Sequence, residues 1–312
     1  MVKQKQNTII RVSEPTELMP FLLSKLGGMT RTSIKALLAH RQVLVNKVVR
    51  TRHDTPLQEG DEITILTGRG NSELRHPKLK IIYEDDHLIV VDKKEGLLTV
   101  ATHPGSTEMT VFSILKAYVK KQNPRNGIYV VHRLDRETSG VLVFAKSPQL
   151  QHYMREYWRE LVTKRTYLAV AEGLFEEKKG TIRSWFTEDK KNAVVYSSPV
   201  DDGGALAITH YEVVKDTAGK SSDDRPDYSL VELHLETGRT NQIRVHLASK
   251  GHPVVGDRKY GHGNEPDYMA FPKTIGADRL CLHAKGLEFI HPANEQVVHF
   301  ESPVPKVFNK LL

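Results

Sequence analysis

A single carboxylate lies in a short basic turn between two apolar runs of the chain. The turn at residues 132–140 holds Asp135 between Arg133 and Arg136, and valine-rich runs suited to buried strands flank it. A carboxylate surrounded by fixed positive charge stays ionised and well oriented. Such a group can attack an electrophile or take a proton. Alone, the pattern is more typical of a charged hairpin tip, so its meaning depends on the rest of the sequence.

Two further segments carry polar residues suited to a reaction. Tyr167 follows three polar residues at the start of an expected strand, although a tyrosine there is more often a core aromatic with a solvated hydroxyl. Farther along, an expected strand ends at residues 237–238 and an expected helix begins near Thr240, a good N-cap residue. Helix N-termini attract anions. Arg239 and Arg244 are therefore placed where a phosphate or a carboxylate would bind.

The composition is that of a globular protein with about two domains. The chain has 312 residues, of which 39% are hydrophobic and 27% charged, as in proteins that bury a core. No run reaches the roughly 18 apolar residues of a membrane helix, and no apolar signal region follows the N-terminus. The single cysteine, Cys281, excludes an intrachain disulfide and a thiolate zinc cluster. We expect a cytoplasmic monomer with no membrane association.

The positive charge is concentrated near the N-terminus. The net charge is +7, and the sequence pI of about 9.2 favours a polyanionic partner. Between residues 25 and 52 there is no acidic residue. A solvated basic face would explain this, but a footprint for an RNA phosphate backbone is favoured. The basic residues of this stretch are Lys25, Arg31, Lys35, Arg41, Lys47, Arg50 and Arg52.

The N-terminal segment has the apolar spacing of two helices followed by a small ribbon of strands. Its sequence at residues 31–38, 43–46 and 57–63 resembles the S4-type RNA-binding domain. That family usually has Arg-Leu-Asp in its first helix, where this chain has residues 18–20. The resemblance implies an RNA-binding domain at residues 8–67 and a linker at residues 68–78.

The remainder, residues 79–312, is expected to form one larger α+β domain. Strands are expected at residues 81–83, 88–91, 141–144, 167–170 and 231–235, and helices at residues 109–121, 149–161 and 241–249.

The polar segments together resemble the RluA-type family of pseudouridine synthases. The matching segments are residues 132–140, 164–167, 238–247, 251–257, 282–284 and 291–292. Two residues depart from the family pattern: Asn241 replaces a usual histidine, and Lys94 replaces a usual proline. The resemblance implies a large mixed, mostly antiparallel sheet with flanking helices, preceded here by a small α/β RNA-binding module. It also implies isomerisation of uridine to pseudouridine in RNA, with no metal, redox cofactor or other small-molecule cofactor.

The resemblance also implies roles for individual residues. Asp135 is expected to act as nucleophile or base towards the sugar or the uracil ring, with Arg244 paired to it. Tyr167 is expected to lie against the uracil face. Arg133 is expected to fill the place of a base that has left the RNA stack. The remaining RNA contacts are expected from Arg239, Gln242, Arg31, Lys35, Arg41 and Lys47.

Other functions remain open at this point. A catalytically idle RNA-binding protein could keep the fold, although binding alone does not need Asp135. A glycoside or nucleoside hydrolase usually needs two separated carboxylates, and Glu137 lies too near Asp135 to be the second. We expect structured RNA as the partner, with large-subunit ribosomal RNA as the first choice and tRNA as the second.

Overall fold

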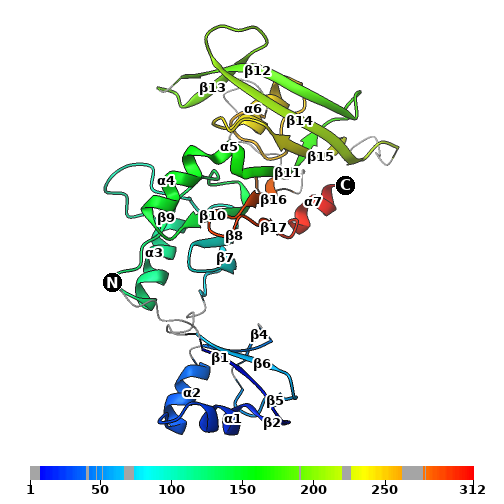
Figure 1. Cartoon of the computed structure of the whole chain (residues 1–312). Coiled ribbons are helices and arrows are strands. Elements are labelled where there is room, and N and C mark those ends of the chain that lie inside the picture. Colours follow the sequence, from blue (N-terminus) through cyan, green and yellow to red (C-terminus); the bar gives the residue numbers. More distant parts are fainter. Residues whose placement is uncertain are drawn as a thin grey trace. The chain divides into compact units, whose positions relative to one another are not determined.

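The computed structural model describes residues 8–39, 42–46, 48–50, 52–66, 74–189, 191–219, 226–261, 277 and 279–312 (Figure 1). The chain divides into two compact units. The first lies within residues 1–75 and 115–127, and the second within residues 76–114 and 128–312. Within the described residues, no helix is both long and apolar enough to cross a membrane.

The first unit contains α1 (Leu18–Lys25) and α2 (Arg31–Ala39), as the apolar spacing predicts. Thr30 directly precedes α2, and its hydroxyl caps the helix by accepting the N–H of Ser33 at 3.2 Å. The unit also has an antiparallel sheet in the order β1-β6-β3-β4 and a short β2–β5 pair. The bounds are β1 (Thr8–Arg11), β2 (Thr16–Glu17), β3 (Val43–Val45), β4 (Val48–Val49), β5 (Pro56–Leu57) and β6 (Glu62–Ile65).

The second unit is built on an 11-stranded mixed sheet. Its strand order is β13-β12-β14-β15-β11-β16-β10-β8-β7, with β17 on β16 and β9 on β10. The β10–β16 pair is parallel and the other described pairs are antiparallel. The strands are β7 (Leu79–Glu84), β8 (Leu88–Lys93), β9 (Tyr129–Val130), β10 (Ser139–Ala145), β11 (Val162–Glu172), β12 (Lys179–Asp189), β13 (Val194–Ser198), β14 (Ala205–Asp216), β15 (Tyr228–Leu235), β16 (Leu282–Ile290) and β17 (Val297–Glu301). The predicted fold class is confirmed.

Helices accompany this sheet at several points of the chain. They are α4 (Pro148–Glu156), α5 (Trp158–Leu161), α6 (Gln242–Ser249) and α7 (Lys306–Leu311), whereas α3 (Val111–Gln122) begins in the second unit and continues into the first. The single helix expected at residues 149–161 is in fact two, α4 and α5, which meet at Tyr157. The predicted N-cap of α6 is also wrong: the N-cap is Asn241, in the left-handed region with φ 54°, and its side chain makes no capping bond.

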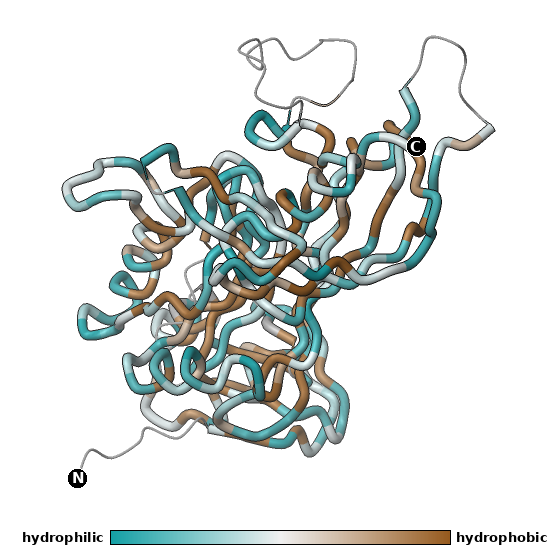
Figure 2. Tube along the Cα trace, turned by 90° about the horizontal axis from the view of Figure 1, so that it is seen from above, coloured by the Kyte–Doolittle hydropathy of each residue, from teal (hydrophilic) through white to brown (hydrophobic). Residues whose placement is uncertain are grey.

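The core follows the central strands. Every residue of β8 and β10 is buried, which suits their continuous apolar sequences because both faces are covered. Apolar residues gather along the inner parts of the trace, and hydrophilic ones occupy most of the outer loops (Figure 2). Gly140 allows β10 to lie against β16, since its φ is +121° and a Cβ there would lie 2.1 Å from the Ala284 carbonyl oxygen. The end of β10 next to the Asp135 turn is therefore fixed to β16.

Candidate active site

A cleft of about 760 Å³ in the second unit brings together the three predicted catalytic residues. Asp135 comes from the turn before β10, Tyr167 from β11 and Arg244 from α6. Arg133 and Arg239, which are predicted RNA contacts, also line the cleft. Segments more than 100 residues apart in sequence thus meet at one site. Further lining residues include Arg155, Trp158, Arg159, Arg165, Gly238 and Ala284.

The backbone on both sides of Asp135 is held by hydrogen bonds. Thr99 donates its hydroxyl to the carbonyl of Leu134 at 2.6 Å. On the other side, the carbonyl of Arg136 accepts a hydrogen bond from the Lys93 ammonium at 3.0 Å and one from the N–H of Gly96 at 2.8 Å. The side chain of Asp135 itself is 48% exposed. The turn therefore presents an open carboxylate on a restrained backbone.

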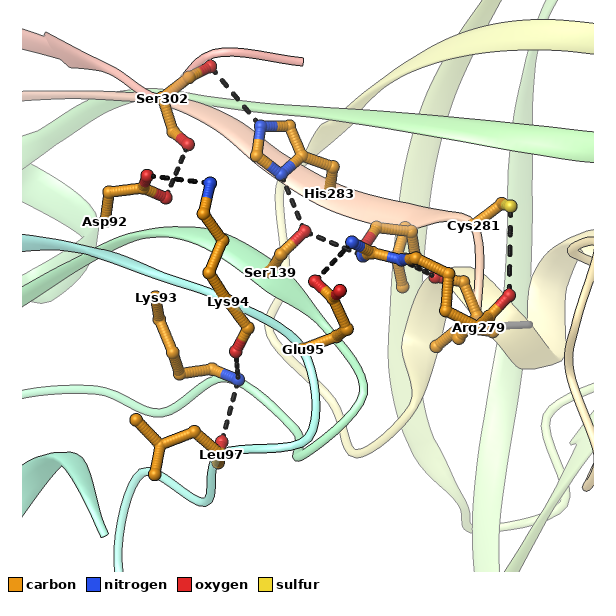
Figure 3. Close-up of polar contacts among 12 residues, drawn as sticks. Asp92, Lys93, Lys94, Glu95, Leu97, Ser139, Arg279, Cys281, His283 and Ser302 are labelled. Carbon is orange, nitrogen blue, oxygen red and sulfur yellow. Dashed lines mark hydrogen bonds and ion pairs between the residues drawn. The ribbon is translucent and has the colours of Figure 1, made fainter. Parts of the chain in front are cut away.

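Lys93 lies beneath this turn and is completely buried. Its ammonium donates to the carbonyls of Leu97, Arg136 and Lys94 at 2.8, 3.0 and 3.2 Å, and Figure 3 shows the contacts with Leu97 and Lys94. Burial lowers the pKa of Lys93 to about 8, although nearby carboxylates, first Glu137 and then Asp135, act in the opposite direction. A buried positive charge thus holds the backbone below the catalytic turn.

A second polar group holds the far end of the turn (Figure 3). Ser139 bonds the Nδ1 atom of His283 at 2.8 Å and accepts a hydrogen bond from Arg279, also at 2.8 Å. Arg279 in turn forms an ion pair with Glu95. Burial lowers the pKa of His283 to about 4, so its ring is neutral at pH 7. Its Nε2 lies 3.3 Å from the Ser302 carbonyl, so this nitrogen carries the proton and Nδ1 accepts from Ser139.

Arg244 is bound more closely to Asp257 than to Asp135. Its Nε and Nη2 each donate to the Asp257 carboxylate at 2.7 Å. Its Nη1 donates to Oδ1 of Asn241 at 3.0 Å and lies 3.9 Å from Oδ2 of Asp135. Burial acts to lower the pKa of Arg244, but the bonds and charge of Asp257 raise it above its usual value. Asp135 thus has a permanent cation beside it without a short hydrogen bond to it.

Tyr167 is partly buried on β11 and faces the same cleft. Burial raises the pKa of its phenol, and the charge of Asp135 adds to that shift while Arg165 opposes it. The ring is therefore uncharged at neutral pH. Arg165 lies in the same cleft, and its Nη2 donates to the carbonyls of Leu235 and Glu236 at 2.8 and 2.9 Å.

Gln242 does not present its amide to the cleft, although it is a predicted RNA contact. The residue is 3% exposed. Its amide oxygen accepts from the Thr237 hydroxyl at 2.8 Å and from the N–H of Arg239 at 3.0 Å. Its amide nitrogen donates to the carbonyl of Ile208 and the hydroxyl of Thr209, both at 2.9 Å. These bonds argue against the predicted contact, because they leave the amide no free donor.

The other predicted RNA contacts are distributed over both units. Arg133 and Arg239 are exposed beside the cleft, and Nε of Arg239 donates to the Leu206 carbonyl at 3.0 Å. Arg31 and Lys35 are exposed on α2 of the first unit. The last two, Arg41 and Lys47, lie outside the described residues.

The sequence reasoning missed the cationic residues Arg155, Arg159 and Arg165 of the cleft. Arg155 and Arg159 are four residues apart in a segment expected to be helical, so they could have been assigned to one face. Among the described residues, no group of three or more His, Cys, Asp or Glu side chains could hold a metal ion.

Comparisons with known proteins identify the family of this chain. A family model described as RNA pseudouridylate synthase matches residues 87–249. The chain belongs to the RNA pseudouridine synthase family. It is 36% identical to the uncharacterized RNA pseudouridine synthase YhcT of Bacillus subtilis, over 85% of this chain and 80% of the relative. It is also 36% identical to the ribosomal large subunit pseudouridine synthase D of Nitrosomonas europaea, over 81% of this chain and 71% of the relative.

The fold of this synthase is shared with a solved structure. The human RNA pseudouridylate synthase domain containing 4 covers 74% of this chain and 92% of its own, with a TM-score of 0.58 and 24% identity. As a member of the RNA pseudouridine synthase family, the enzyme isomerises uridine to pseudouridine in RNA.

Proposed function

We propose that this synthase modifies uridines of large-subunit ribosomal RNA and that Asp135 is its catalytic nucleophile or base. The observation that carries the assignment is the meeting of Asp135, Tyr167 and Arg244 in one cleft of about 760 Å³. The similarity to the ribosomal large subunit pseudouridine synthase D of Nitrosomonas europaea supports the choice of substrate. A tRNA uridine is the second candidate.

The reaction leaves the composition of the nucleotide unchanged. The bond from the sugar to N1 of uracil breaks, the ring turns, and a carbon–carbon bond to ring carbon 5 forms, while that carbon gives up its hydrogen to solvent as a proton and N1 takes up a proton. Asp135 suits the first step, because its carboxylate is 48% exposed and accepts no hydrogen bond from any arginine in the described part of the chain. Nη1 of Arg244, 3.9 Å from Oδ2 of Asp135, places a positive charge beside it. Tyr167 offers an uncharged ring against which the uracil can stack.

A uridine within structured RNA must leave its stack to reach Asp135, which costs a few kcal/mol. The cleft volume lies in the usual range for sites that enclose a small molecule. Arg133 is exposed beside the catalytic turn, so we assign it the place that the base vacates. Arg239 and the cleft arginines Arg155 and Arg159 provide positive charge for the neighbouring phosphates.

We assign the first unit the role of an S4-type RNA-binding domain, with the domain at residues 8–67, a linker at 68–78 and the catalytic domain at 79–312. The exposed Arg31 and Lys35 on α2 support this role. Deleting residues 1–70 should weaken RNA affinity and reduce its dependence on salt, because phosphate contacts release counterions. Equal affinity of the deleted and full-length chains across a salt series would contradict the assignment.

The test of the catalytic role is the substitution Asp135→Asn. It keeps the shape of the side chain and removes its charge, so turnover should fall by at least roughly 10⁴-fold while RNA binding changes little. Glu137→Gln is the matched control, since it makes the same change at an exposed position two residues away. An Asp135→Asn enzyme with near wild-type turnover would remove the basis of the assignment.

Mapping pseudouridines in RNA from cells that lack the protein tests the substrate. We expect the loss of one or more pseudouridines from large-subunit ribosomal RNA. A loss confined to tRNA would establish the second candidate instead.

A further inference from the structure

The cation beside Asp135 is held in place by a different carboxylate. Asp257 binds the Nε and Nη2 atoms of Arg244, each at 2.7 Å, in the two-pronged geometry that suits an arginine and a carboxylate. Asp135 is 3.9 Å from the remaining terminal nitrogen, Nη1. The closer of the two ion pairs is thus the one with Asp257, a residue that has no role in the reaction proposed above.

Asp257 cannot easily follow a movement of the arginine. Its side chain is completely buried. Besides Arg244, its Oδ1 accepts the backbone N–H groups of Lys259 and Tyr260 at 2.9 and 3.0 Å. The preceding Gly256 has φ +82°, and a Cβ there would lie 2.0 Å from the Arg279 carbonyl oxygen. The carboxylate is therefore a fixed point of the fold rather than a mobile partner.

Asn241 and Tyr260 restrain the other side of the guanidinium. Asn241 lies at φ 54°, a left-handed conformation that asparagine tolerates better than most residues. Its Oδ1 accepts from Nη1 of Arg244 at 3.0 Å, and its Nδ2 donates to the Tyr260 hydroxyl at 3.1 Å. The Tyr260 ring centre lies 5.1 Å from Cζ of Arg244, within range of a cation–π contact.

We propose that Asp257 is a positioning residue of the isomerisation, which acts through Arg244 and is assisted by Asn241 and Tyr260. By binding the Nε and Nη2 edge of the guanidinium, Asp257 fixes Arg244 in a position where its Nη1 lies 3.9 Å from Asp135 and forms no short hydrogen bond with it. Asp135 keeps a fixed positive charge beside it, and its oxygens remain open to the nucleotide. This inference rests on the catalytic roles proposed above for Asp135 and Arg244.

The test compares Asp257→Asn in two backgrounds. In the wild-type background, kcat should fall roughly 10- to 100-fold, the size expected for loss of a charge-assisted pair, while KM stays within about twofold because Asp257 does not touch RNA. Turnover is measured as tritium released from ring carbon 5 of uridine in unmodified large-subunit ribosomal RNA transcribed in vitro. In an Arg244→Lys background, the same substitution should cost about twofold or less, because a lysine cannot use both carboxylate oxygens.

Asp85→Asn is the matched control. Asp85 also accepts two backbone N–H groups, from His87 and Leu88, and its carboxylate bonds the imidazole of His291 outside the cleft. Its kcat should equal that of the wild type.

Several results would overturn the inference. An equal loss of kcat from Asp257→Asn in both backgrounds would show a purely structural role, as would a rise in KM at unchanged kcat. If Arg244→Lys leaves no measurable turnover, the division between kcat and KM in the single variant decides. Failure of the proposed function looks different: Asp135→Asn would then retain turnover, whatever the result at Asp257.

Discussion

Lys93 should make the stability of the second unit depend on pH between about 8 and 10.5. Burial holds its pKa at about 8 in the folded protein, against a usual value of 10.5. One pKa unit corresponds to 1.36 kcal/mol, so burying the charged ammonium costs roughly 3 kcal/mol below pH 8. Between the two pKa values, the unfolded chain keeps a proton that the folded chain has lost, and the free energy of unfolding therefore rises with pH.

The substitution Lys93→Met removes this titration. The difference in unfolding free energy, wild type minus Lys93→Met, should increase by roughly 3 kcal/mol from pH 8 to pH 10.5. Urea unfolding followed by tryptophan fluorescence measures this difference. The chain has two tryptophans, Trp158 and Trp185, and both lie in the second unit. The signal therefore reports on that unit alone. Other ionisations cancel in the difference.

Lys80→Met provides the control, because Lys80 is exposed on β7. Its unfolding free energy should run parallel to that of the wild type over the whole pH range. Parallel curves for the wild type and Lys93→Met from pH 7 to pH 11 would refute the reasoning, because they would mean that the ammonium is solvated or moves out of its buried position.

Three further substitutions follow from the geometry. Asn241→Ala removes the Nη1 acceptor of Arg244, so kcat should fall about 2- to 10-fold at unchanged KM; steady-state kinetics will show it, and a change in KM alone would be inconsistent. Gln242→Leu leaves the partners of a buried amide unsatisfied and should lower the unfolding free energy by about 2–4 kcal/mol in urea. Gly140→Ala introduces a clash with Ala284 and a strained φ; the same measurement should show a loss of about 2–6 kcal/mol, and wild-type stability would disprove the close approach.

The local parts of the site could be predicted from sequence. The catalytic turn is a polar segment bounded by apolar residues, and α6 follows β15, which ends at Leu235, just before the expected end at Thr237 and Gly238. Short-range patterns of this kind predict strands and helices because they depend on neighbouring residues alone. The structure then places Asp135, Tyr167 and Arg244 in one cleft, as the resemblance implies.

The partner of Arg244 could not be predicted in the same way. A guanidinium within reach of two carboxylates can bind either, and only the distances show that Asp257 takes the two-pronged position. The burial of Gln242 has the same origin, because its four bonds are to residues of β14 and of the segment between β15 and α6. The break between α4 and α5 could not be predicted, because the apolar residues of this segment keep their helical spacing through Tyr157.

The position of β16 in the sheet determines when the catalytic cleft can form during synthesis of the protein. This strand, Leu282–Ile290, lies between β10 and β11 and so joins the strand after Asp135 to the strand that carries Tyr167. Both β10 and β11 leave the ribosome long before β16. A nascent chain therefore cannot close its catalytic cleft until residues 282–290 have emerged, and ribosomes stalled before residue 282 should display chains that release no tritium from uridine.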